Sequence, residues 1–154
     1  MPDNAFSVDI ALAKRLFMIY FSLNLHIEKN QEDNLKHLFV VDDSITTLKL
    51  AENALKDHFE LTLLTSGTQL FAALARRLPD LILLDIEMPD IDGMTIVEKL
   101  KSVIGWEKIP VIFLTSHSEK QVVMTGFELG VLDYIVKPFD VAALPERIKK
   151  HLKV

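Results

Sequence analysis

The segment Leu81-Ile-Leu-Leu-Asp85, followed by Ile86-Glu-Met-Pro-Asp-Ile-Asp-Gly93, decides the fold class. Its apolar run Leu81–Leu84, which shows no alternation with polar residues, is typical of a strand that is buried on both faces of a parallel sheet. The loop after Asp85 is rich in turn residues, so we expect the strand to end there. Similar short runs occur outward from it, at Leu38–Val41, Leu61–Leu64, Val111–Leu114 and Tyr134–Val136.

Segments with helical spacing separate these runs. Apolar positions three and four apart occur in the series Leu48, Ala51, Leu55, His58, in Leu70, Leu74, Leu78 and in Leu144, Ile148, Leu152. Ser116-His-Ser-Glu119 fits a capping box, and Pro145 predicts that the last helix begins near this residue. The alternation predicts an α/β fold, a doubly wound five-stranded parallel sheet with helices on both faces.

Composition limits the class of protein. The chain has 154 residues, of which 49% are hydrophobic, so we expect one globular domain with a short extension. The absence of Cys excludes disulfides, Cys-based zinc sites and thiol catalysis. Its net charge of −5 argues against direct nucleic acid binding. No feature indicates export, so we expect a cytoplasmic protein.

Residues 1–34 differ from the regular pattern of residues 35–154 and are expected to form an apolar helix and a polar linker. The run Leu16–Leu23 is apolar in almost every helical direction, and a stripe precedes and joins it at Phe6, Ile10, Ala13, Phe17 and Tyr20. Asp9, Lys14 and Arg15 interrupt the segment, so we expect no membrane span. We expect this helix to be buried against a second copy of the chain in a homodimer. The alternative is that the sequence starts too early and these residues have no structural role.

Polar residues follow the ends of four predicted strands: Asp42 and Asp43, Asp85, Thr115, and Lys137. Because ligands bind beyond the carboxyl ends of parallel strands, we expect these side chains to meet on one rim. Three carboxylates without His or Cys favour Mg²⁺, and the ammonium and hydroxyl can bind phosphoryl oxygens. Asp85 is the best candidate nucleophile, because it ends the central strand.

Four motifs make residues 35–154 resemble the receiver domain of two-component response regulators: Phe39-Val-Val-Asp-Asp-Ser44, Leu83-Leu-Asp-Ile-Glu-Met-Pro-Asp-Ile-Asp-Gly93, Val111-Ile-Phe-Leu-Thr-Ser116 and Asp133-Tyr-Ile-Val-Lys-Pro-Phe139. The resemblance implies a flavodoxin-like sheet of order 2-1-3-4-5 flanked by five helices. It implies a phosphorelay module that a sensor histidine kinase or histidine phosphotransfer protein phosphorylates. Beyond slow self-dephosphorylation, such a module is not an enzyme.

The resemblance also implies roles for the rim residues. Asp85 would be the phosphoacceptor, and Asp43 would bind Mg²⁺ directly. Asp42 would hold the water shell of the ion, and the backbone carbonyl of Glu87 would complete the protein ligands. Lys137 would bind the phosphoryl group.

Other residues would carry the switch. Thr115 would move toward the acyl phosphate, and Tyr134 would then move inward. This movement would change the face made by the fourth helix, the fifth strand and the fifth helix of the domain. Pro138 would follow a cis peptide bond, and Glu87 and His117 would flank the path of the hydrolytic water and tune its reaction.

Three alternatives differ from this interpretation. A haloacid-dehalogenase-like phosphohydrolase would carry Asp-x-Asp after the first strand, where this chain has Asp42-Asp43-Ser44. A flavodoxin-like FMN module would need a Gly-rich loop there, and the two carboxylates would repel the phosphate. A phosphorylation-independent scaffold receiver is disfavoured, because every residue type of an acceptor site is present.

Overall fold

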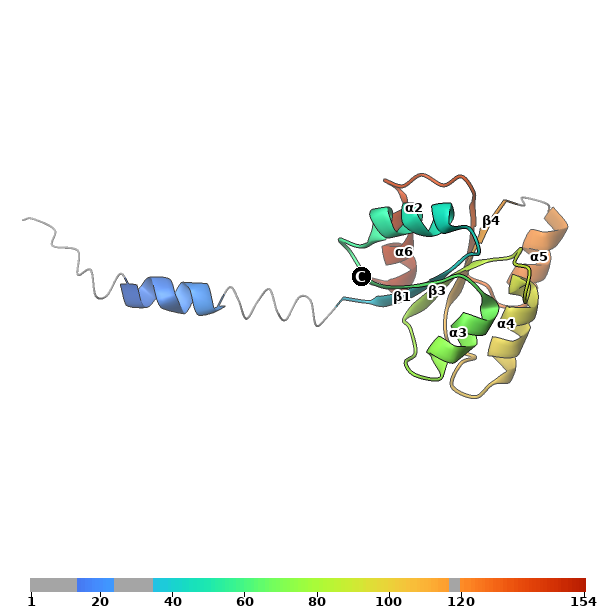
Figure 1. The fold of residues 1–154 in the computed structure, drawn as a ribbon, viewed down its shortest axis with the longest axis horizontal. Coiled ribbons are helices and arrows are strands. Elements are labelled where there is room, and N and C mark those ends of the chain that lie inside the picture. The colour runs from blue at the N-terminus through green and yellow to red at the C-terminus, as the bar shows by residue number, and fades with distance from the viewer. Residues whose placement is uncertain (1–13, 24–34, 117–119) are drawn as a thin grey trace, which may run out of the picture. The chain divides into compact units, whose positions relative to one another are not determined.

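A computed structural model describes residues 14–23, 35–116 and 120–154, so part of the predicted N-terminal stripe lies outside the described residues. The chain divides into two compact units, Met1–Leu35 and Lys36–Val154. The first contains helix α1 (14–23), and the second contains a five-stranded sheet (Figure 1). Within the described residues, no helix has the length and apolar character needed to cross a membrane.

The predicted parallel sheet is confirmed, with the order β2-β1-β3-β4-β5. Each observed strand contains the predicted apolar run and is one residue longer, because the sheet pairing continues to the neighbouring polar residue. The strands are β1 (His37–Val41), β2 (Glu60–Leu64), β3 (Leu81–Asp85), β4 (Val111–Thr115) and β5 (Asp133–Val136).

Five helices flank the sheet: α2 (Ile45–Leu55), α3 (Gly67–Leu74), α4 (Gly93–Ser102), α5 (Lys120–Glu128) and α6 (Leu144–Leu152). Helices α2 and α6 pack on one face, where Leu48 and Ile148 join a core cluster with Leu83. Helices α3, α4 and α5 cover the other face, where a second cluster contains Leu84 and Phe113. Neighbouring residues of a strand therefore enter different clusters, as the apolar runs predict.

Two predicted helices end earlier than their spacing indicated. Helix α2 ends at Leu55, so His58 lies in the turn before β2. Helix α3 ends at Leu74, so Leu78 lies beyond the helix and is 47% exposed. Helical backbone is disfavoured at Leu78 because Pro79 follows it. The last helix begins at Leu144 with Pro145 in its first turn, as predicted. Most of the predicted capping box falls on residues 117–119, which lie outside the described residues.

Candidate functional site

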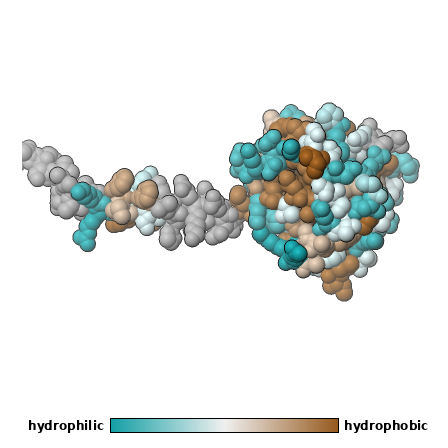
Figure 2. All heavy atoms as spheres, viewed as in Figure 1, coloured by the Kyte–Doolittle hydropathy of each residue, from teal (hydrophilic) through white to brown (hydrophobic). Residues whose placement is uncertain are grey.

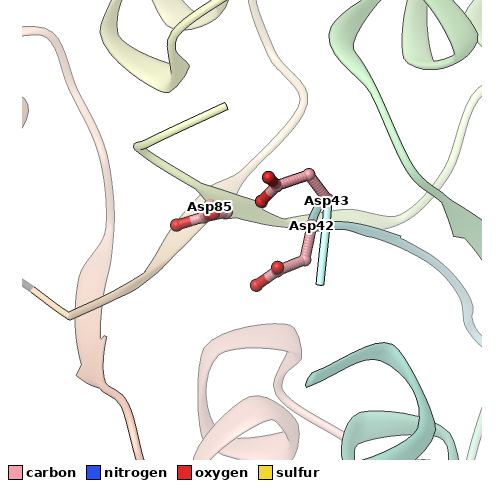
Figure 3. Close-up of side chains that lie close together, drawn as sticks. All are labelled: Asp42, Asp43 and Asp85. Carbon is pink, nitrogen blue, oxygen red and sulfur yellow. The ribbon is translucent and has the colours of Figure 1, made fainter. Parts of the chain in front are cut away.

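The three predicted carboxylates meet at the carboxyl end of the sheet (Figure 3). Asp42 and Asp43 follow β1 directly, and Asp85 is the last residue of β3. Ser44 ends this short connection, because its side chain caps α2 by accepting a hydrogen bond from the Thr47 N–H. The Ser44 N–H also donates to Asp42 Oδ1 at 2.8 Å, which fixes that carboxylate.

The carboxylates form a site of hard oxygen ligands. One oxygen from each of Asp42, Asp43 and Asp85 lies within 4.8 Å of the others. Asp42 and Asp85 are buried, whereas Asp43 is exposed, so the group opens to solvent on one side. Like charges so close together favour either a bound cation or protonation. Oxygen donors without His or Cys fit Mg²⁺.

Lys137 is the cation that the structure places among these carboxylates. Its Nζ lies 2.8 Å from Asp42 Oδ2 and 3.2 Å from Asp85 Oδ1. Burial lowers the pKa of Lys137, but hydrogen bonds and charge attraction from the two carboxylates outweigh burial and raise the pKa above its usual value. The peptide bond from Lys137 to Pro138 is cis. The Lys137 N–H donates to the Thr115 carbonyl at 2.8 Å, which brings the ends of β4 and β5 together.

The charge state of Asp85 depends on its surroundings. Burial and the nearby Asp42 carboxylate raise the pKa of Asp85 to about 6, although Lys137 and the Glu87 backbone N–H act in the opposite direction. A positive charge added beside Asp85 would favour its ionised form, which is the form that can act as a nucleophile.

The predicted switch residues lie in the neighbouring strands β4 and β5. Thr115 is fully buried at the end of β4. Tyr134 is only 8% exposed, and its hydroxyl donates to the carbonyl oxygen of Val122 in α5 at 2.8 Å. The sequence-based interpretation had Tyr134 move inward after phosphorylation. In the structure the ring is already buried, packed edge-on against Phe113 and Phe127.

The loop after Asp85 carries the remaining described candidate. Glu87 is exposed, and its backbone N–H supports the Asp85 carboxylate. The Gly93 N–H closes the loop by donating to the Ile86 carbonyl at 2.7 Å. His117, the second residue predicted to tune hydrolysis, lies outside the described residues.

Sequence reasoning missed the residue that fastens this loop to its neighbour. Asp90 accepts hydrogen bonds from the N–H groups of Gly67 and Thr68, in the first turn of α3. These bonds, with one from the Ile91 N–H, outweigh desolvation and bring the pKa of Asp90 to about 2. In the sequence Asp90 reads only as a turn residue, and no local pattern indicates a partner 22 positions earlier.

Comparison with known proteins gives one family. The response regulator receiver domain matches residues 38–149. A probable cyclic di-GMP phosphodiesterase of Vibrio cholerae is 34% identical over 86% of this chain and 30% of its own length. The DNA-binding transcriptional regulator NtrC of Salmonella typhimurium is 35% identical over 74% of this chain and 25% of its own length.

A solved structure agrees with these relatives. The crystal structure of a putative response regulator from Chloroflexus aurantiacus has a TM-score of 0.73 and 29% identity, covering 79% of this chain and 100% of that one. The chain spans less than a third of the length of the two sequence relatives. The family match lies within the sheet domain, and the chain belongs to the receiver domain family of two-component response regulators.

Proposed function

We propose that the chain accepts a phosphoryl group on Asp85 from a phosphohistidine of a sensor histidine kinase or a histidine phosphotransfer protein. One observation carries the proposal. Lys137 Nζ contacts both Asp42 and Asp85, beside the open carboxylate of Asp43. A buried nucleophile, an ammonium and oxygen ligands for a cation are the groups that phosphoryl transfer requires.

In the proposed reaction an Asp85 carboxylate oxygen attacks the phosphorus atom. The phosphorus–nitrogen bond breaks, its electron pair stays on the imidazole nitrogen, and an acyl phosphate forms on Asp85. Lys137 offsets negative charge on a phosphoryl oxygen. Asp43 and Asp85 would hold Mg²⁺ directly, Asp42 through its water shell, and the ion would supply further positive charge to the phosphoryl oxygens. Slow hydrolysis would return Asp85, so the chain is a switch and not an enzyme.

The switch would be read on the face formed by α5, β5 and α6. The Thr115 hydroxyl would bind the acyl phosphate, and Tyr134 would be favoured in its buried position. Three apolar side chains support a contact surface there, since Met124, Phe127 and Val136 are each 46% to 49% exposed. Binding partners that prefer one position of Tyr134 would sense phosphorylation.

The phosphoacceptor proposal is tested with acetyl phosphate or phosphoramidate, mapping the product by mass spectrometry. We expect one phosphoryl group on Asp85, with labelling lost in Asp85→Asn or without Mg²⁺. Labelling that persists in Asp85→Asn would overturn the assignment. An unlabelled parent would favour the scaffold alternative, and steady turnover of phosphomonoesters would favour a phosphohydrolase.

We also propose that α1 joins two copies of the chain. Within its own unit, seven large apolar side chains of this ten-residue helix are each more than half exposed (Figure 2). Such a helix needs cover on several sides. Light scattering on the full chain and on a version starting near Asn34 decides the matter. A dimer that truncation converts to a monomer supports the proposal, and a monomeric full chain contradicts it.

A further inference from the structure

Helix α5 carries a glycine where Tyr134 packs against it. Gly126 is buried within Lys120–Glu128, one helical turn after Val122, whose carbonyl accepts the Tyr134 hydroxyl. A Cβ atom on residue 126 would overlap the Tyr134 hydroxyl oxygen and would lie 2.9 Å from its ring carbon Cζ. The Tyr134 hydroxyl therefore occupies the space that any side chain on residue 126 would need.

The backbone gives no other reason for glycine at this position. Among the described residues, Gly105 and Gly130 are the glycines with positive φ, and Gly126 is not one of them. Glycine within a helix is unfavourable relative to alanine, because it loses more conformational freedom on folding. The close approach of Tyr134 therefore explains why residue 126 is a glycine.

A packed ring connects this contact to the phosphoacceptor end of the sheet. Phe113 is fully buried in β4, with its ring centre 5.3 Å from that of Tyr134. Its Cε2 atom lies 3.1 Å from the position of a Cβ on residue 126, and its Cε1 atom lies 3.1 Å from that of a Cβ on Gly93. A Cβ on Gly93 would also lie 2.6 Å from the Asp85 carbonyl oxygen. Close packing therefore extends from the backbone of Asp85 to α5.

We propose that Gly126 holds Tyr134 in its buried position before phosphorylation, and so acts as the positioning residue that sets the resting state of the switch. The inference rests on the proposed function, in which phosphorylation of Asp85 favours buried Tyr134. A receiver in which Tyr134 is already buried needs less free energy to reach the conformation of the phosphorylated state. It should therefore bind a phosphoryl mimic more tightly than a receiver whose tyrosine is displaced.

The first test measures access to Tyr134. The chain is nitrated with tetranitromethane and the rate at Tyr134 is mapped by mass spectrometry, with the urea-unfolded chain as the reference. We expect protection in the parent and a rate increase of about tenfold in Gly126→Ala, the size of one lost hydrogen bond. Thr125→Ala is the matched control, because it changes a neighbouring helix position and should leave Tyr134 protected. An unprotected Tyr134 in the parent, or equal protection in Gly126→Ala, would overturn the inference.

The second test uses stability. At a helix position without such a contact, Gly→Ala raises the urea midpoint, because alanine favours the helix. Gly126→Ala should lower it instead, and the double variant Gly126→Ala, Tyr134→Phe should recover part of the loss, because removing the hydroxyl relieves the closest overlap but leaves Cζ near the new Cβ. If only the double variant folds, the overlap is shown directly. A raised midpoint in Gly126→Ala, or a double variant no better than the single one, would contradict the inference.

The third test concerns the switch. Beryllofluoride with Mg²⁺, a mimic of the phosphoryl group, is titrated by NMR. We expect Gly126→Ala to weaken its apparent affinity about fivefold, and the control Thr125→Ala to leave it unchanged. Unchanged affinity in Gly126→Ala, with the parent phosphorylated on Asp85, would refute the effect on the switch. A parent that is never phosphorylated on Asp85 would refute the proposed function, and nitration would still decide whether Gly126 holds Tyr134.

Discussion

Asp133 offers a measurable link between β5 and α6. Its carboxylate accepts hydrogen bonds from Arg147 Nε at 2.7 Å and Arg147 Nη2 at 2.8 Å, and His151 Nε2 lies 2.9 Å away. Burial raises the pKa of Asp133, but these contacts and the Tyr134 N–H outweigh burial and bring it to about 2. We predict that Asp133→Asn lowers the free energy of unfolding at neutral pH.

The size of the loss follows from the pKa. The drop from 3.8 to about 2 corresponds to roughly 2.4 kcal/mol at about 1.36 kcal/mol per unit. The Asp133 side chain is 20% exposed, so solvent screening reduces this value, and we expect a loss of about 1 to 2 kcal/mol. Because the folded pKa is lowered, the stabilisation is complete above about pH 5 and disappears as the pH falls toward about 2.

Urea unfolding of the parent and Asp133→Asn, at pH 7 and at steps down to pH 3, measures this contribution. Glu60→Gln is the matched control, since Glu60 also forms a two-bond pair with an arginine, Arg77, at 2.6 and 2.9 Å. That pair is 46% and 58% exposed, so its loss should be much smaller. Equal losses in the two variants, or a loss in Asp133→Asn that does not shrink at low pH, would refute the reasoning.

Three further predictions concern the acidic rim and its loop. Lys137→Ala should still accept a phosphoryl group on Asp85, more slowly, but beryllofluoride should no longer shift the NMR signals of Tyr134; equal shifts in variant and parent would contradict the role of Lys137. Asp43→Asn should weaken Mg²⁺ binding, measured by calorimetry, and a loss no greater than that of an unrelated surface Asp→Asn variant would count against direct binding. Asp90→Ala should speed amide hydrogen exchange in the first turn of α3 about fivefold, because its N–H groups lose their acceptor; unchanged exchange would show that Asp90 does not fasten the loop.

The sheet and its rim could be predicted because the signals are local. Each strand is a short apolar run that ends at a polar residue, and parallel pairing brings all such ends to one edge. Asp42, Asp85 and Lys137 could therefore be placed together from the sequence, and in the structure Lys137 Nζ lies within 3.2 Å of an oxygen of each carboxylate. The helix ends were less predictable, because apolar spacing continues past the residues where the backbone turns, as at His58 and Leu78.

The packing of Tyr134 could not be predicted, because it depends on a residue that lacks a side chain. Gly126 looks like a weak point in a helix when α5 is read alone, and no pattern pairs it with a strand residue eight positions later. The sequence therefore allowed an outward tyrosine that moves inward on phosphorylation, which is the arrangement expected from the family resemblance. The contact between α5 and β5 in the structure shows that the Tyr134 hydroxyl fits into the space left by the missing side chain of Gly126.

The contacts of Tyr134 also indicate which part of this residue moves more easily. The Tyr134 N–H donates to the Asp133 carboxylate at 2.8 Å, and its carbonyl accepts from Arg147 Nη2 at 2.6 Å. The backbone of Tyr134 is thus tied to α6 by the same arginine that pairs with Asp133, whereas its ring is held to α5 by one hydroxyl bond and by packing against Phe127. Because the backbone ties are charge-assisted and the hydroxyl bond is neutral, rotation of the side chain should require less free energy than displacement of β5. Substituting Asp133 should therefore change stability, whereas substituting Gly126 should change the position of the ring.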